Sequence, residues 1–327
     1  MSDIKISLPK QSVSLRDLPA ADYVLTQKLA DAVEVALALE QPLLITGEPG
    51  TGKTGLAYRI AHDLHEASKG EFAEKPLTFV TQTTSMAQDL FYYYDALSHF
   101  HDANLKKADQ HAAPKVSNYI ELRALGKAIA LTNPAQAQAY LRSPEDQALA
   151  QKAQNRVVLI DEIDKAPRDF PNNLLDQLVG YRFRIKEDGN QQITLGQGRR
   201  VVVLLTSNSE KALPEAFLRR CVFFHIPFPN EEQLLRIIRA RLGEKSKYAD
   251  KALIEHFFKI REKVNRKPPA TAELLAWLRI LELHEFHKKG SASPAKWTSA
   301  QKDLLKLSYP VLAKTQEDLE MLLEDGV

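Results

Sequence analysis

Cysteine, net charge and long apolar runs are all scarce in this 327-residue sequence. The single cysteine, Cys221, cannot form an internal disulfide, so the chain is not a disulfide-stapled scaffold. No apolar run approaches the length of about 18 residues that crosses a bilayer, and residues 1–11 lack the apolar core of a signal peptide. We therefore expect a cytoplasmic protein without a membrane span. The formal net charge of +2 is too small to indicate a nucleic-acid or membrane partner.

Short apolar runs separated by helix-like segments dominate the chain up to about residue 228. Because these runs are rich in β-branched residues and nearly uninterrupted, they predict strands of a largely parallel sheet buried on both faces. The five runs are LLIT (43–46), LTFVT (77–81), VVLI (157–160), VVVLLT (201–206) and VFFHI (222–226). Helical spacing of apolar residues over 22–39 predicts a helix before the first strand. The fold class is therefore α/β.

The chain changes character near residue 228, between Pro227 and Pro229. Long amphipathic helical patterns follow, and none of the later runs reads as a strand. The patterns cover residues 231–242, 250–263, 271–287 and 300–325. We expect an α/β domain over residues 1–228 and a smaller all-α domain over residues 229–327.

A long segment separates the second and third strand candidates. Its length of roughly 70 residues exceeds a simple crossover, which predicts an insert over about residues 85–130. The pattern indicates helical parts at 85–100 and 119–130, with a polar bridge at 101–115.

Two local features stand out around this insert. The aromatic run Phe91 to Tyr94 suits a surface that grips a partner, but packing of a helix on the domain is favoured, because neighbouring aromatic residues on a helix point in several directions. Further along, YRFRI and QQITL flank an Asp-Gly-Asn turn, which predicts a β-hairpin over residues 181–195.

The most specific motif is GEPGTGKT at residues 47–54, which matches G-x-x-x-x-G-K-[ST] between a strand and a helix candidate. Its glycines let backbone amides curl around phosphate groups, Lys53 brings positive charge to the β- and γ-phosphates, and Thr54 offers a hydroxyl ligand to Mg²⁺. The sequence therefore predicts a P-loop that binds ATP and Mg²⁺. Its binding residues are Gly47, Glu48, Pro49, Gly50, Thr51, Gly52, Lys53, Thr54 and Gly55.

Two further strand candidates end in polar residues. RVVLIDEID at 156–164 places Asp161 to hold Mg²⁺, directly or through water, and Glu162 to polarise the attacking water. Asn208 follows the strand at 201–206 and reaches the carboxyl edge of the sheet, where ligands bind in open α/β folds. We expect Asn208 to orient the same water, and Asp164 to be an ordinary surface residue.

These motifs, together with LPEAFLRRC at 213–221, resemble the AAA+ ATPases and, within them, the MoxR group. The insert after the second strand resembles that group's helix-2 insertion, and the hairpin resembles its pre-sensor hairpin. The resemblance covers roughly residues 20–285 and implies a five-stranded parallel sheet in the order 5-1-4-3-2 with an all-α lid domain. It also implies a ring, usually a hexamer, with nucleotide bound between subunits.

The resemblance assigns two further positions. MoxR-like proteins usually read L-P-E-A-x-x-D-R-F where this chain has LPEAFLRRC, so Arg220 takes the position of the arginine finger that reaches a neighbour's γ-phosphate. Arg219 stands where the family has Asp, which leaves open which arginine acts. In the lid, Ala272 stands at the position of the sensor-2 arginine, so the sensor-2 residue is also open.

The resulting expectation is a Mg-ATP-dependent ATPase that works as a ring homo-oligomer and remodels a client protein. Its catalytic residues are Lys53, Glu162, Asn208 and Arg220, and its metal ligands are Thr54 and Asp161. By the resemblance, the client often carries a von Willebrand A domain.

Two alternatives stay open. A nucleic-acid motor or loader is one, because the hairpin carries Arg182, Arg184 and Lys186, with Arg199 and Arg200 just after it. A nucleotide-gated scaffold with little turnover is the other, since the sensor-2 arginine is missing.

Overall fold

The computed structural model of the chain describes residues 19–108, 114–178, 180–209, 211–264, 266–290 and 296–325. The chain divides into two compact units. Of the described residues, the larger unit comprises those within Leu25–Glu48 and Gly52–Ile226, and the smaller comprises Pro49–Thr51, those from Pro227 onward and those up to Val24. Residues 1–11, which lack a signal-peptide core, lie outside the described residues. Residues 109–113 of the expected polar bridge lie outside them as well.

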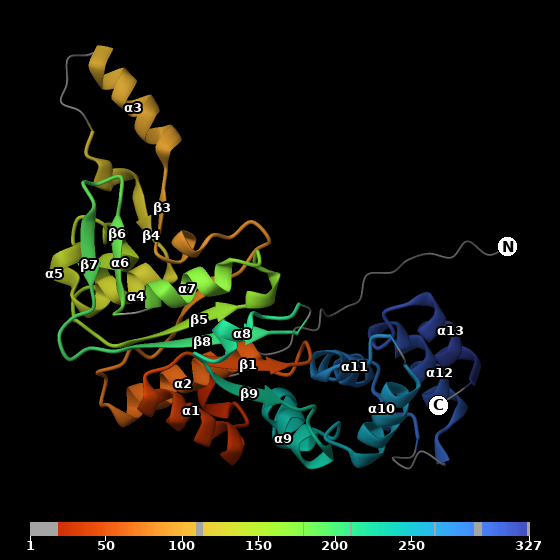
Figure 1. Cartoon of the computed structure of the whole chain (residues 1–327). Helices are drawn as coiled ribbons and strands as arrows, with labels where there is room; N and C mark the ends of the chain where they lie inside the picture. Colours follow the sequence, from red (N-terminus) through yellow and green to blue (C-terminus); the bar gives the residue numbers. More distant parts are fainter. Residues whose placement is uncertain are drawn as a thin grey trace. The chain divides into compact units, whose positions relative to one another are not determined.

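A five-stranded parallel sheet forms the centre of the larger unit (Figure 1). Its strands are β1 (Leu43–Gly47), β2 (Leu77–Val80), β5 (Arg156–Asp161), β8 (Val201–Ser207) and β9 (Val222–Ile226). They lie in the order β2-β5-β8-β1-β9, and every neighbouring pair is parallel. The five predicted strands and the α/β class are confirmed. If these five strands alone are renumbered from 1 to 5 in chain order, their order in the sheet, read from β9, is 5-1-4-3-2.

Helices cover both faces of this sheet. Figure 1 shows α1 (Gln27–Leu39) and α2 (Lys53–Ala67) on one face, and α4 (Ala124–Thr132) and α7 (Phe170–Leu178) on the other. The short elements α5 (Pro134–Ala137), α6 (Pro144–Leu149), η4 (Ile163–Lys165) and α8 (Glu215–Leu218) connect the larger ones. Consequently β1 is buried along its whole length, whereas burial alternates along the edge strands β2 and β9.

The first helix is shorter than predicted. The Thr26 hydroxyl accepts a hydrogen bond from the Leu29 backbone N–H at 3.4 Å, so α1 begins at Gln27. Residues Ala20–Asp22 form a separate 3₁₀ turn, η1. The helical spacing of apolar residues begins at residue 22, before this cap. Periodicity alone therefore placed the start of the helix too early.

The insert contains strands where helices were predicted. Its elements are η2 (Ala87–Leu90), β3 (Tyr92–Tyr94), α3 (Ala96–Ala108), η3 (Val116–Tyr119), β4 (Ile120–Leu122) and then α4. The helix predicted over 85–100 is wrong at its aromatic run, because β3 pairs antiparallel with β4, with Tyr92 opposite Leu122. The second predicted helix, over 119–130, begins only at Ala124 for the same reason.

The predicted hairpin is present as β6 (Arg182–Ile185) and β7 (Gln191–Thr194). Gly189 and Asn190 turn the chain with positive φ angles of 62° and 59°. The hairpin is fixed to the insert, since the rings of Phe91 and Phe183 lie 5.1 Å apart. At its tip, the Tyr92 hydroxyl donates a hydrogen bond to Glu187 at 2.8 Å.

From residue 231 onward, every described element of regular structure in the smaller unit is a helix. Its elements are α9 (Glu231–Leu242), α10 (Lys251–Lys263), α11 (Thr271–Leu283), η5 (Phe286–Lys288), α12 (Ser299–Ser308), η7 (Tyr309–Val311) and α13 (Gln316–Asp325). The single helix predicted over 300–325 is wrong. Pro310 cannot continue the hydrogen-bond ladder of α12, and the Thr315 hydroxyl accepts from the Asp318 N–H to start α13. No helix of the described chain is long and apolar enough to cross a membrane.

A histidine lies in the core of the smaller unit. His256 is 3% exposed, stacks on the rings of Trp277 and Tyr309, and shares a 3.2 Å hydrogen bond with the Tyr309 hydroxyl. Burial, with a smaller contribution from Lys259, lowers the pKa of His256 from its ordinary 6.5 to about 4. The neutral ring is therefore the form that the folded unit accommodates.

This burial makes the smaller unit sensitive to acid. Because the unfolded chain binds a proton near pH 6.5 and the folded chain only near pH 4, stability is complete above pH 6.5 and falls as the pH drops toward 4. At pH 5 the loss amounts to about 2 kcal/mol. We expect urea titrations followed by tryptophan fluorescence to show it, because both tryptophans, Trp277 and Trp297, lie in this unit.

The matched variants are His256→Phe and His284→Asn, the second at an exposed position. The difference in stability between pH 7 and pH 5 should shrink by about 2 kcal/mol in the first variant and stay at the wild-type value in the second. An unchanged difference in His256→Phe would mean that the buried ring is not its source.

Candidate nucleotide site

The loop between β1 and α2 is shaped to receive an anion. Gly47, Gly50 and Gly52 have φ angles of 153°, 76° and 87°, which glycine adopts without a steric penalty. Gly52 is the N-cap of α2. Because the first turn of a helix leaves backbone N–H groups without intrahelical partners, the loop and this helix end form a cradle suited to phosphate.

Lys53 is folded into this loop. Its ammonium group donates hydrogen bonds to the carbonyl oxygens of Gly47 at 2.8 Å and Glu48 at 2.9 Å, and the residue is only 7% exposed. Burial lowers the pKa of Lys53, while the nearby carboxylate of Asp161 acts in the opposite direction. The lysine charge is thus held at the centre of the loop.

A hydrogen-bonded cluster joins the loop to the next two strands. The Thr54 hydroxyl donates to one carboxylate oxygen of Asp161 at 2.9 Å, and the Thr206 hydroxyl donates to the other. Thr206, at the end of β8, is fully buried and also accepts the Glu162 backbone N–H at 2.9 Å. The sequence analysis did not single out Thr206, although it lies two residues before Asn208 in the TSN motif.

Glu162 leaves the strand in a left-handed conformation, with φ 57°. One carboxylate oxygen lies 2.6 Å from the Lys165 ammonium, and the other lies 3.4 Å from the Asn208 side-chain nitrogen. The predicted pair Glu162 and Asn208 therefore meets at the carboxyl edge of the sheet. Lys165 was missed, and its position three residues after Glu162 is the only signal in the sequence.

Four further positions were singled out from the sequence, Asp164, Arg219, Arg220 and Ala272. Asp164 is 2% exposed, so its description as a surface residue is wrong. Arg219 and Arg220 follow α8 as exposed residues, and Arg219 lies 3.7 Å from the Glu215 carboxylate. Ala272 is exposed in the first turn of α11, where it lies beside Gly50 of the P-loop.

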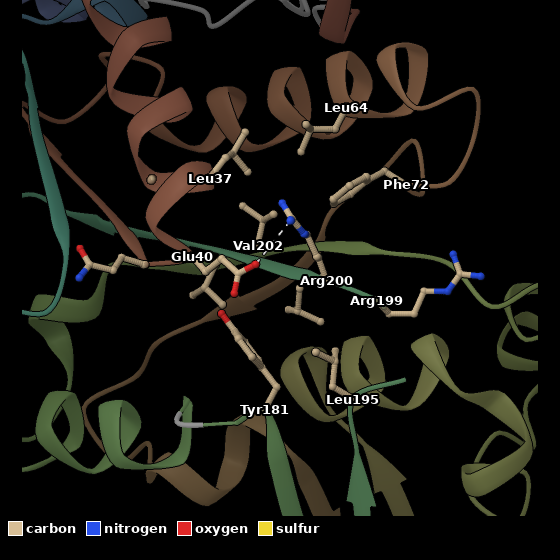
Figure 2. A pocket seen from close by; sticks show the side chains of 13 residues that line it. Leu37, Glu40, Leu64, Phe72, Tyr181, Leu195, Arg199, Arg200 and Val202 are labelled. Atoms are coloured by element: carbon tan, nitrogen blue, oxygen red, sulfur yellow. Dashed lines mark ion pairs between the residues drawn. The ribbon is translucent and has the colours of Figure 1, made fainter. Parts of the chain in front are cut away.

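A cavity of about 150 Å³ lies at the opposite, amino-terminal edge of the same sheet, where β8 begins (Figure 2). Arg200 and Glu40 form a 3.6 Å ion pair there, and Tyr181 points toward Glu40 (Figure 2). Burial, aided by the charge of Glu40, raises the pKa of Tyr181 to about 12. Since the P-loop follows the carboxyl end of β1, this cavity is separate from the phosphate cradle.

Comparison with known families agrees with this geometry. The model of the ATPase family associated with various cellular activities (AAA) matches residues 43–230, which is more than half of the chain. The chain belongs to this family and is a P-loop ATPase, an enzyme that hydrolyses ATP. Comparison with curated proteins gives no match.

The residues present fit a magnesium nucleotide. The Thr54 hydroxyl and the Asp161 carboxylate bring hard oxygen donors together at the mouth of the P-loop, the ligand type that Mg²⁺ prefers. Thr206 occupies the other carboxylate oxygen, so the Asp161 side chain is fixed in one orientation.

Replacing Thr206 by Val should lower kcat for ATP hydrolysis about 10- to 100-fold, because a buried hydrogen bond to a charged group is lost and the Glu162 N–H loses its acceptor. Steady-state kinetics should place the loss in kcat more than in KM. Thr206→Ser keeps the hydroxyl and should retain most of the activity. Equal activities of the Val and Ser variants would contradict the role of this hydrogen bond.

Proposed function

We propose that this chain is a Mg-ATP-dependent ATPase of the MoxR type, which assembles into a ring and remodels a partner protein. The observation that carries the proposal is the meeting of Glu162 and Asn208 beside the Thr54–Asp161 pair. A water held between Glu162 and Asn208 at this edge would face the terminal phosphate of a nucleotide in the P-loop.

Each residue takes a distinct part in hydrolysis. The P-loop amides and Lys53 bind the phosphates. Thr54 and Asp161 would hold Mg²⁺, which when bound would offset the charge that develops on the transferring phosphoryl group. Glu162 accepts hydrogen bonds from the attacking water, and Asn208 orients it. The Lys165 ammonium lies 2.6 Å from the Glu162 carboxylate and helps to orient it at this edge.

Arg220 completes the site from a neighbouring chain in this proposal. It is exposed after α8, so a second copy can bring its guanidinium to the γ-phosphate. Because such an interface is head-to-tail, repeated copies close into a ring, and we propose a hexamer.

The client is a protein, and one with a von Willebrand A domain is the first candidate. The insert and the β6–β7 hairpin support this proposal, because the insert exposes Leu97 and Phe100, and the hairpin exposes Arg182 and Arg184, none of which the P-loop needs. We place the reaction in the cytoplasm, in keeping with the single, half-buried cysteine.

A mixing experiment tests the shared site. Glu162→Gln and Arg220→Ala should each lower ATP turnover by at least about 100-fold, because one loses the base and the other the transition-state cation. In an equal mixture, about one quarter of the interfaces combine an intact Glu162 with an intact Arg220, so about a quarter of wild-type turnover should return.

Arg219→Ala serves as the matched control and should leave turnover near the wild-type value. Wild-type turnover per chain should also rise with protein concentration as the ring assembles. Turnover that is independent of concentration and insensitive to Arg220→Ala would rule out the shared site and leave a monomeric ATPase.

A further inference from the structure

The β6–β7 hairpin separates its charges by face. Alternate side chains of the first strand, Arg182, Arg184 and the following Lys186, are exposed, while Phe183 and Ile185 are buried against the insert. Successive residues of a strand point to opposite faces. The three cations therefore form one row along the solvent face, with a spacing of about 6.7 Å between neighbours.

The carboxylates near the tip of the hairpin are hydrogen-bonded to tyrosine hydroxyls. Glu187 accepts a hydrogen bond from the Tyr92 hydroxyl at 2.8 Å, and Asp188 accepts one from the Tyr140 hydroxyl at 2.7 Å. Tyr92 belongs to β3, and Tyr140 lies in the turn after α5. The two acidic residues at the tip are thus used for anchoring, and among the described residues neither forms an ion pair with the cations.

Neutral side chains lie opposite the row on β7. Arg182 pairs with Thr194, and Arg184 pairs with Gln192, whose side-chain oxygen accepts a 3.3 Å hydrogen bond from the Arg184 Nε. Within the described part of the chain, Arg182, Arg184 and Lys186 form no ion pair with a carboxylate. Their charge is available to a partner.

The backbone at this strand is also open. On the other side of the hairpin, the Gln136 carboxamide accepts from the Thr194 N–H at 3.1 Å and donates to the Gln192 carbonyl at 3.3 Å. These two backbone groups therefore point away from β6. In an antiparallel pair, the residues opposite them, Arg182 and Arg184, must then point their own N–H and C=O groups outward.

The two edges of the hairpin thus differ. A side chain covers the β7 edge, whereas the described residues give the outward backbone groups of Arg182 and Arg184 no hydrogen-bond partner. The β6 edge closes only at Lys186, whose N–H donates to the Tyr92 hydroxyl at 3.3 Å. An unpaired strand edge is a template for another strand.

We propose that the β6 edge binds an extended acidic segment of the client polypeptide, which adds as a strand and sets its carboxylates against the cationic row. This inference rests on the proposed function and names the chemistry of the client. Side chains on one face of an extended peptide repeat at the same spacing of about 6.7 Å as the cations, and guanidinium groups bind carboxylates with two parallel hydrogen bonds.

A polypeptide fits better than single-stranded nucleic acid. Proteins that bind single strands combine a positive groove with aromatic rings on which bases stack. The solvent face of the hairpin, all of whose residues are described, presents cations, Gln192 and Thr194 but no exposed aromatic ring.

The test uses a fluorescein-labelled peptide of alternating Glu and Thr and the full-length protein, with binding followed by fluorescence anisotropy. Binding should weaken as salt rises. The triple variant Arg182→Glu, Arg184→Glu, Lys186→Glu should bind at least about tenfold more weakly. Its ATP turnover without peptide should stay at the wild-type value.

The charge-matched control is Lys302→Glu, Lys306→Glu, Lys314→Glu, which reverses three exposed lysines of the smaller unit. This variant should bind the peptide as the wild type does. Equal binding by both triple variants and the wild type would overturn the docking site and leave the ATPase results untouched. Conversely, if the protein binds the peptide but does not hydrolyse ATP, the proposed function alone is overturned.

Two further probes separate strand addition from other modes of binding. The same peptide with N-methyl groups at every second residue, made in both registers, should bind poorly in the register whose amides face β6. Equal affinity of both methylated peptides with the parent would overturn strand addition. A single-stranded oligonucleotide that binds more tightly than the peptide, and loses binding in the hairpin variant, would overturn the polypeptide assignment.

Discussion

The Asp161 carboxylate and its two hydroxyl donors are the contact on which the nucleotide site depends. Thr54 lies 107 residues from Asp161 in the sequence, and Thr206 lies 45 residues from it. The sheet brings them together, because β5 lies beside β8 and β8 lies beside β1, with Ile160 opposite Leu205. A shift of one residue in the pairing of β5 with β8 would turn Asp161 or Thr206 to the wrong face of the sheet. The burial of the central strands therefore fixes the register that the chemistry requires.

The larger unit uses hydroxyl–carboxylate contacts for two different purposes. At the carboxyl edge, Thr54 and Thr206 orient Asp161 toward a nucleotide. At the hairpin, Tyr92 and Tyr140 hold Glu187 and Asp188 and so leave the neighbouring cations exposed. Burial raises the pKa of Tyr92 to about 12, so its hydroxyl stays protonated as a donor well into the alkaline range. Both arrangements convert local hydrogen bonding into a defined charge pattern at the surface.

Sequence patterns predicted the parts of the fold that are set by local chemistry. The five sheet strands and the glycine-rich loop were recognisable because buried strands require continuous apolar runs and a P-loop requires glycine at fixed positions. Tyr92 to Tyr94 were assigned to a helix because their pairing partner, β4, lies beyond α3 and leaves no local sign. Thr206 was overlooked for a similar reason, because its two partners, Asp161 and Glu162, lie at the end of another strand, β5. The break at Pro310 was visible in the sequence, but the amphipathic pattern on either side concealed it.

The central claim is that Thr54 and Asp161 form the metal end of a nucleotide site. Electron paramagnetic resonance of Mn²⁺, used in place of Mg²⁺ with a slowly hydrolysed ATP analogue, tests this claim directly. The account predicts that Mn²⁺ binds tightly only when the nucleotide is present, and that Asp161→Asn weakens this binding while nucleotide binding without metal changes little. Mn²⁺ binding that is independent of nucleotide, or equal in the wild type and Asp161→Asn, would contradict it.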